Sequence, residues 1–348
     1  MDTKVLRQKV LDLAIRGKLV PQDPNDEPAS VLLERIRQQK QQMVKDGKLK
    51  AKDIKNDTII FVSEDNLHYE KFADGSVKCI EDEIPFELPD GWAWSRLGAV
   101  AEAIGDGDHQ PPPQTSFGVP FLVISNVSGG RLSFENTRFV SKEYFSQLPE
   151  TRKPRNGDLL FTVTGSYGIP VLIDSDDKFC FQRHIAIVRP CTISNRYLYV
   201  ILGSSYVKSI CDAKATGTAQ KTVGLATLRE LLIPVAPYKE QMQIYAQTQD
   251  ALSIVDSVSS DKEDLLNIIE SAKAKILDLA IRGQLVPQDP TDEPASVLLE
   301  RIRAEKEELI KQGKIKRDKK ESVIFRGEDN SYYEKMGGKV VWKCQEMC

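Results

Sequence analysis

The feature that most constrains this chain is a long internal repeat. Residues 11–37 read LDLAIRGKLVPQDPNDEPASVLLERIR and residues 277–303 read LDLAIRGQLVPQDPTDEPASVLLERIR, so only Lys18/Gln284 and Asn25/Thr291 differ. The likeness continues with more drift, because IIFVSEDNLHYEK at 59–71 matches VIFRGEDNSYYEK at 323–335. Two copies this far apart are too few for a solenoid of short units. We therefore interpret residues 11–37 and 277–303 as a first frame and a second frame around one intervening block.

Each frame predicts a helix, a proline corner and a second, charged helix. Before the first corner, apolar residues recur at helical spacing, and Gly17 can end that helix. Prolines at positions 21, 24 and 28 exclude a continuous helix, while Asp26 as the N-cap and Pro28 in the first turn can begin a new one. The new helix stops near Gly47 and carries three apolar residues on one face: Leu32, Ile36 and Met43.

A much longer helical pattern precedes the second frame. From Lys239 to Arg282 there is no proline or glycine, and apolar residues repeat every three or four positions. A helix of roughly 40 residues would be on the order of 60 Å long. Such a helix either packs on its own domain or pairs with another long helix, and its length favours pairing.

Composition limits the class of protein. The length of 348 residues permits about two or three domains, and 41% apolar with 28% charged residues indicates a globular chain. The net charge of −3 shows that the chain as a whole is not a polycation, although a local basic face could still bind DNA. There is no apolar run of transmembrane length and no signal peptide at the first residues, so we expect a cytoplasmic protein.

Short apolar runs between glycines and prolines indicate strands in the intervening block. They are residues 118–125, 157–166, 169–174 and 184–190, and one helix is expected near Tyr197–Asp212. The predicted fold class is mixed α+β, with a strand-rich block and long helices that form a coiled-coil-like stem. The expected parts are an N-terminal helical region (1–57), the block (58–238), the long helix with the second helical repeat (239–320) and a truncated second block (321–348).

The sequence lacks the common catalytic signatures. It contains no phosphate-binding loop of the form GxxxxGK[ST], no Rossmann fingerprint and no GxSxG elbow. Six cysteines without a CxxC pair, together with three histidines, indicate free thiols in a reducing compartment rather than a zinc site. Asp106, Asp108 and His109 could hold a metal, but a glycine turn of this kind is usually a solvated loop. We therefore predict no enzyme activity, no cofactor and no metal.

Four loops of the block carry groups that suit a polynucleotide, namely hydroxyls, amides, basic groups and an aromatic ring. The first loop offers His109, Gln110, Gln114 and Thr115, and the second offers Thr164, Ser166 and Tyr167. The third offers Gln182, Arg183 and His184, and the fourth offers Thr218, Gln220 and Lys221. Each loop taken alone could be an ordinary hydrogen-bonded surface turn. Taken together, and without a catalytic set, the four loops favour binding.

These residues resemble a known family. The repeat, DGDH at 106–109, GDLLFTVTGSYG at 157–168, FQRHIAIVRP at 181–190, GTAQKTV at 217–223 and IPVAPYKEQ at 233–241 are similar to a specificity subunit of a type I restriction-modification system. The resemblance implies that residues 58–238 are a target recognition domain that reads half of a split DNA site. It also implies helices that dock methyltransferase subunits, which bind S-adenosylmethionine and methylate adenine, and a separate restriction motor.

The chain departs from this family in its C-terminal part. Complete members carry two recognition domains, whereas here the likeness to the first copy ends at GGKVV, residues 337–341. We interpret the chain as a half-subunit that would need a homodimer to read an interrupted palindrome. An alternative is a silent scaffold that binds the methyltransferase without productive DNA recognition.

Roles within the loops follow from side-chain chemistry. Lys221 and Arg155 are expected to position phosphates, whereas Gln182 and Arg183 are expected to read adenine and guanine edges. His184 is either a DNA contact or a packed strand residue. A free-standing nuclease would need an acidic metal cluster, which the sequence does not present.

Overall fold

The structure is a computed structural model that describes residues 2–110, 112–218, 220–318, 321–336 and 339–343. Residues 341–343 are described by their backbone alone. The chain divides into two compact units, Met1–Leu266 and Asn267–Cys348. The helices are α1 (Thr3–Ile15), α2 (Ala29–Lys45), α3 (Ala51–Ile54), α4 (Lys142–Gln147), α5 (Asn195–Leu202), α6 (Ser205–Lys214), α7 (Leu225–Glu230), α8 (Tyr238–Ile281) and α9 (Ala295–Lys311). Short 3-10 turns are η1 (Glu81–Glu83), η2 (Leu97–Val100), η3 (Ile124–Asn126) and η4 (Glu150–Arg152).

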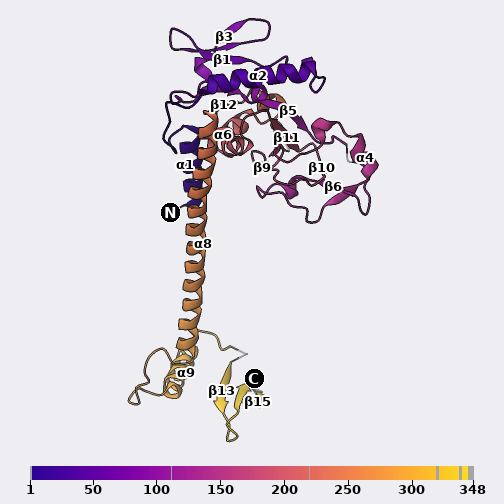
Figure 1. Cartoon of the computed structure of the whole chain (residues 1–348). Helices are drawn as coiled ribbons and strands as arrows, with labels where there is room; N and C mark the ends of the chain where they lie inside the picture. The colour runs from indigo at the N-terminus through magenta and orange to yellow at the C-terminus, as the bar shows by residue number, and fades with distance from the viewer. Residues whose placement is uncertain (1, 111, 219, 319–320, 337–338, 344–348) are drawn as a thin grey trace. The chain divides into compact units, whose positions relative to one another are not determined.

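Among the described residues five small sheets accompany these helices, so the fold is mixed α+β as predicted (Figure 1). A first meander contains β1 (Ile59–Val62), β2 (His68–Lys71) and β3 (Val77–Cys79), and β4 (Ala93–Arg96) pairs with β12 (Leu232–Val235). The central sheet has the order β5 (Ala101–Asp106), β11 (Ile185–Pro190), β8 (Leu159–Thr162) and β9 (Pro170–Leu172). A smaller sheet has the order β10 (Cys180–Phe181), β6 (Val119–Leu122) and β7 (Arg138–Val140), and a second meander contains β13 (Ser322–Arg326), β14 (Tyr332–Met336) and β15 (Lys339–Lys343).

The first frame folds as the predicted helix, corner and helix. Gly17 follows α1 with a φ of +63°, which only glycine adopts without strain. The prediction that Asp26 caps the next helix is wrong, because α2 begins after Pro28 with no side-chain cap. The amide of Ala29 instead donates to the carbonyl of Gly91 at 2.8 Å. A backbone group of the following domain therefore satisfies the start of α2.

Both helices of the first frame contribute to the main core of the first unit. The core cluster contains seven apolar residues of the frame together with Trp92 and Tyr197: Leu11, Ala14, Ile15, Val20, Ala29, Leu32 and Ile36. Burying a leucine or isoleucine side chain contributes about 1.5–3 kcal/mol. The first frame is therefore an integral part of the packed block, and the expected face of α2 is confirmed at Leu32 and Ile36.

A buried ion pair fixes the first meander to β4. The guanidinium of Arg96 in β4 donates from Nη2 to Oε2 of Glu70 at 2.6 Å and from Nε to Oε1 at 3.0 Å. Glu70 is 4% exposed, so the pair lies in a low-dielectric setting where a bidentate geometry is strong. This contact connects the segment after α3 to the sheet of β4 and β12.

The central sheet and the smaller sheet confirm the predicted strands. β6, β8, β9 and β11 fall within the four apolar runs found in the sequence. The prediction of one helix near Tyr197–Asp212 is wrong, because the segment forms α5 and α6 with a break at Gly203. Ser204 accepts a hydrogen bond from the amide of Val207 at 3.3 Å and thereby starts a new helix.

The long helix is present as α8, which has 44 residues and neither proline nor glycine. Within the first unit, buried residues such as Gln241, Ile244 and Thr248 hold its first turns in the core. α1 lies beside it, since Arg7 pairs with Asp256 and Thr3 contacts Ser259 (Figure 1). Over the part of the chain that the structure describes, none of the helices combines the length and apolarity needed to cross a membrane.

The second unit repeats the local structure of the first frame and first meander. α9 has 17 residues, like α2, and Gly283 has a φ of +65°, like Gly17. In the second meander Phe325 stacks on Tyr333 at 5.8 Å between ring centroids, just as Phe61 stacks on Tyr69 at 6.0 Å. The sequence repeat is therefore a structural repeat.

Candidate nucleic-acid interface

Three of the four predicted loops emerge at one end of the central sheet. β11 runs antiparallel to both neighbours, with Ala186 opposite Asp106 of β5 and Ile185 opposite Thr162 of β8. The loop after Asp106, the loop after Thr162 and the loop before Ile185 must therefore leave the sheet on the same side. Strand order, which the sequence alone does not give, brings these segments together.

Backbone hydrogen bonds join the first and third loops. The amide of Asp108 donates to the carbonyl of Phe181 at 3.0 Å, and the amide of Arg183 donates to the carbonyl of Asp108 at 3.1 Å. Gly107 lies between them, where a Cβ atom would be 1.9 Å from the carbonyl oxygen of Phe181. Only glycine permits this approach, so the two loops are held at a fixed distance.

The second and fourth loops are joined in the same way. The amide of Gly165 donates to the carbonyl of Lys221 at 3.1 Å, and the amide of Val223 donates to the carbonyl of Val163 at 2.8 Å. The amide of Val163 in turn donates to the carbonyl of His184 at 3.0 Å, which connects this pair to the third loop. All four loops consequently form one continuous surface.

Most of the predicted contact residues are accessible on this surface. Gln182 is half-buried, and the exposed ones are His109, Gln110, Gln114, Thr115, Ser166, Arg183, Thr218, Gln220 and Lys221. Pro111 and Ala219 lie outside the described residues. The surface therefore presents basic, amide and hydroxyl groups on a framework held by backbone bonds, which suits contacts to phosphates and base edges.

Three predicted residues are engaged elsewhere. Thr164 is buried, and its hydroxyl lies 3.2 Å from that of Thr222. The hydroxyl of Tyr167 donates to Asp212 at 2.8 Å, a bond that raises the pKa of Tyr167, and the ammonium of Lys208 lies 4.1 Å from its ring centroid. Arg155 precedes β8, at the opposite end of that strand from the second loop, and pairs with Glu150 at 3.0 Å.

His184 has features of both predicted alternatives, a DNA contact and a packed strand residue. Its side chain is half-buried, and burial followed by the charge of Arg183 lowers the pKa of its imidazole, so the ring is neutral at pH 7. Within the described residues its Nδ1 atom is buried and has no hydrogen-bond partner. The neutral ring is thus packed beside the third loop with one polar atom unsatisfied.

Two positioning residues were missed by the sequence analysis. Arg152 lies 3.5 Å from Asp108 and 3.9 Å from Asp106, and Tyr144 is hydrogen-bonded to Asp108. His109 Nε2 also lies 2.8 Å from Asp106. These contacts give both aspartates partners, and no group of three metal-ligating side chains occurs among the described residues. The basic run TRKPR at 151–155 was the only sequence signal for Arg152.

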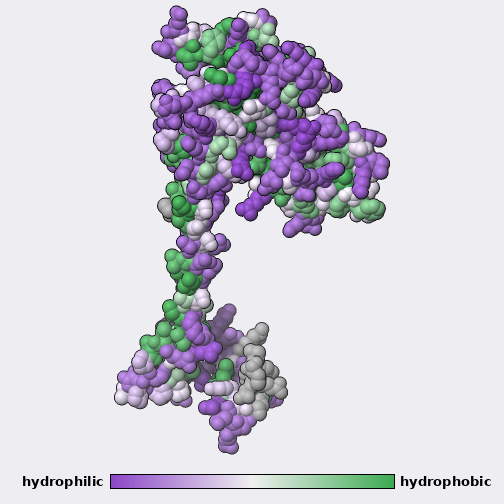
Figure 2. Space-filling view, in the orientation of Figure 1, coloured by the Kyte–Doolittle hydropathy of each residue, from purple (hydrophilic) through white to green (hydrophobic). Residues whose placement is uncertain are grey.

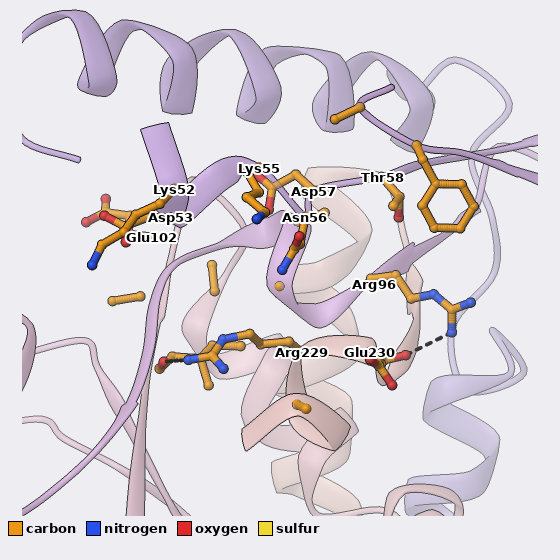
Figure 3. Close-up of a pocket in the computed structure, with 18 of the residues that line it drawn as sticks. Lys52, Asp53, Lys55, Asn56, Asp57, Thr58, Arg96, Glu102, Arg229 and Glu230 are labelled. Atoms are coloured by element: carbon orange, nitrogen blue, oxygen red, sulfur yellow. Dashed lines mark hydrogen bonds between the residues drawn. The ribbon is translucent and has the colours of Figure 1, made fainter. Parts of the chain in front are cut away.

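A separate cavity of about 1040 Å³ lies between α3, the first meander, β5 and α7 (Figure 3). Its labelled residues carry both signs of charge, since Lys52, Lys55, Arg96 and Arg229 are basic and Asp53, Asp57, Glu102 and Glu230 are acidic. Burial raises the pKa of Glu102. None of the predicted contact residues lines this cavity, so it is distinct from the loop surface.

Comparison with known proteins connects this loop surface with a family. Residues 89–267 match the family model described as the type I restriction modification DNA specificity domain. This range covers the central sheet, the four loops and most of α8.

Two curated relatives give the same assignment. The type I restriction enzyme EcoAI specificity subunit of Escherichia coli is 32% identical over 91% of this chain and 58% of its own length. The EcoEI specificity subunit of Escherichia coli is 30% identical over 91% of this chain and 57% of its own length. A crystal structure of the HsdS subunit from Thermoanaerobacter tengcongensis matches with 23% identity, a TM-score of 0.41 and coverage of 73% of this chain and 56% of that one. The chain thus spans less than two thirds of the curated relatives it matches.

Proposed function

The chain belongs to the specificity subunits of type I restriction-modification systems, and on this premise we propose that it directs a type I DNA adenine methyltransferase to a bipartite DNA site. It would act by binding and would contribute no catalytic group. S-adenosylmethionine would be bound by the partner methyltransferase subunit rather than by this chain.

The backbone connection of the four loops is the observation that carries this proposal. A reader of base edges must hold its side chains in register with the groove, and a rigid backbone reduces the ordering cost of binding. Here Asp108, Arg183, Gly165 and Lys221 are joined through their own backbone groups. The loops therefore present their side chains from a preformed surface.

The roles within this surface follow from chemistry and exposure. The exposed guanidinium of Arg183 suits a guanine edge, and the amide of Gln182 suits an adenine edge. The exposed ammonium of Lys221, with hydroxyls such as that of Ser166, suits phosphates. Arg155 lies away from the four loops, so the proposed contact surface does not include it.

The helices supply the proposed protein contacts. In α8, Leu265, Ile268 and Ile276 are more than half exposed, at 57%, 64% and 51%. Long helices with an apolar stripe are stabilised by pairing. We propose that these residues form part of a homodimer contact and of the surface that docks methyltransferase subunits, and through them a restriction motor. A dimer would place two recognition domains (residues 58–238) on an interrupted palindrome.

The test is selection from random-sequence DNA by the chain in complex with its methyltransferase subunit, followed by mapping of methylated adenines. We expect one enriched site with two half-sites, methylated at a fixed position in each, and binding that weakens as salt rises. Binding that is equal for all sequences, with the methyltransferase still attached, would overturn the proposal and favour a silent scaffold.

A further inference from the structure

The two frames differ sharply in what covers them. Ile15 is 0% exposed whereas its counterpart Ile281 is 86% exposed, and Leu11 is 7% exposed whereas Leu277 is 63% exposed. The same holds in the corner and second helix, where Val20, Leu32 and Ile36 are at 7%, 1% and 1% and their counterparts Val286, Leu298 and Ile302 are at 67%, 43% and 49%. Figure 2 shows hydrophobic residues at the surface along α8 and α9. The second frame thus has an uncovered apolar face.

The first frame shows what this face fits. We use the term dock for the surface that receives the first frame, made of Phe86, Pro89, Gly91, Trp92, Tyr197 and Glu240. Against the dock, the guanidinium of Arg16 lies 4.3 Å from the ring centroid of Phe86, and Gln22 Nε2 donates to Glu240 at 3.1 Å. A Cβ atom on Gly17 would be 2.4 Å from Cγ of Pro89. The contact is therefore close and specific for this frame sequence.

Every residue that meets the dock is the same in the second frame. The two positions that differ, Lys18/Gln284 and Asn25/Thr291, are exposed in the first frame and lie outside the core cluster. Arg282, Gly283 and Gln288 repeat Arg16, Gly17 and Gln22. The second frame therefore has a side-chain set that is complete for the same dock.

The second frame also has the docked shape before anything covers it. Gln288 Nε2 donates to the carbonyl of Gly283 at 2.9 Å, as Gln22 does to Gly17 at 2.7 Å. Arg282 Nε donates to Asp278 at 2.8 Å, as Arg16 does to Asp12 at 2.8 Å. Because the corner is preorganised, docking requires little ordering of the backbone.

We propose that the second frame is a working replacement for the first, and that it can occupy the dock on a second copy of this chain. Within one chain the dock is already held by the first frame, so the second frame is left without a partner surface among the described residues. A second copy carries a chemically identical dock. Either frame would make the same buried contacts with the dock. Tethering within the chain and protein concentration therefore decide which frame is bound to a given dock.

The uncovered apolar face of the second frame would let one chain bind the recognition domain of another. The inference concerns packing between copies, and it does not depend on DNA binding by the loops. Its partner is defined by chemistry, as a recognition domain with the aromatic and carboxylate groups of the dock and with its own first frame displaced.

The test uses the full chain with matched substitutions at equivalent positions. The variants are Ile15→Asp, Ile281→Asp and the double variant, each studied by light scattering and by thermal unfolding at several protein concentrations. We expect Ile15→Asp to unfold at a midpoint that rises with concentration, because an intact second frame fills the emptied dock of another copy. The double variant should lose this dependence and unfold at a lower temperature, since neither frame can fill the dock.

Two results would overturn the proposal. One is that Ile15→Asp and the double variant have the same mass and the same unfolding midpoint, which would show that the second frame cannot replace the first. The other is that Ile15→Asp is more stable than the double variant at every concentration but shows no concentration dependence beyond that of Ile281→Asp, which would show filling within one chain. The milder series with Ile15→Ala and Ile281→Ala decides the question in the same way if aspartate at position 15 prevents folding.

Discussion

The carbonyl oxygen of Asp108 accepts a hydrogen bond from the amide of Arg183 at 3.1 Å. This single bond joins two loops that are far apart in the sequence, and it holds an exposed guanidinium beside the turn that carries His109 and Gln110. Arg152 and Tyr144 contact the carboxylate of the same aspartate. The loop surface is thus held in place from the side of α4 and η4, outside the loops themselves.

The close approach of Gly107 to Phe181 predicts a sharp effect of one methyl group. In Gly107→Ala the new Cβ atom would meet the carbonyl oxygen of Phe181 at 1.9 Å, so the first and third loops must separate. We expect a loss of about 1–3 kcal/mol in the free energy of unfolding, together with weaker sequence-specific binding. Gly129→Ala is the matched control, because nothing lies within 4 Å of its added Cβ. Urea unfolding and titration with the selected DNA site measure both effects, and equal values for the two variants would contradict the explanation.

The proposed division between base readers and other cations predicts a difference between two arginines. Arg183→Ala should weaken binding to the selected site by about 1–3 kcal/mol and relax the preference at one position. Arg155→Ala removes the same charge outside the four loops, so it should leave the order of preference among sequences unchanged. A competition assay with site variants tests this, and a similar loss of discrimination in both variants would count against the assigned surface.

The exposed ammonium of Lys221 predicts an effect on salt dependence. Lys221→Gln removes one cation while keeping a polar side chain, and each phosphate contact contributes close to one unit to the slope of log K against log salt. We expect the slope to fall by about 1 and binding to weaken equally for all sequences. Titrations at several salt concentrations, with specific and random duplexes, provide the measurement. An unchanged slope would show that Lys221 does not contact a phosphate.

Local signals in the sequence predicted the elements well. Glycines and prolines delimited β6, β8, β9 and β11, and the proline corner and the long helix were recognised because both depend on short-range rules. The break at Gly203 was missed, because a single glycine inside a helical pattern does not by itself distinguish one helix from two, although Ser204 after it is a typical N-cap residue.

Long-range relationships could not be predicted in the same way. The sequence gives no reason why the first frame should pack on Trp92 and Tyr197, or why Arg152 should meet Asp108, because both contacts depend on the sheet order. Arg155 was grouped with the loops on its charge alone, and the strand direction of β8 places it at the other end. The four loops were recognised by their composition, but their joining into one surface required the antiparallel register of β5, β11 and β8.

The half-buried carboxyl of Glu102 predicts a pH effect on stability. Burial raises its pKa above the usual 4.5, while more distant cations such as Arg189 and Arg155 act in the opposite direction. Because the folded state then binds the proton more tightly than the unfolded state, the contribution of Glu102 to the free energy of unfolding is fully present below about pH 4.5 and is lost as the pH rises through the raised pKa.

Glu102→Gln keeps the size and polarity of the side chain but cannot ionise. We therefore expect the variant to gain stability relative to the wild-type chain between pH 4.5 and the raised pKa, and to keep a constant advantage above it. Urea unfolding of both chains at a series of pH values gives this difference directly, with the exposed Glu135→Gln as a control for the loss of one carboxylate. A difference that does not change with pH would show that Glu102 is as well solvated in the folded chain as in the unfolded one.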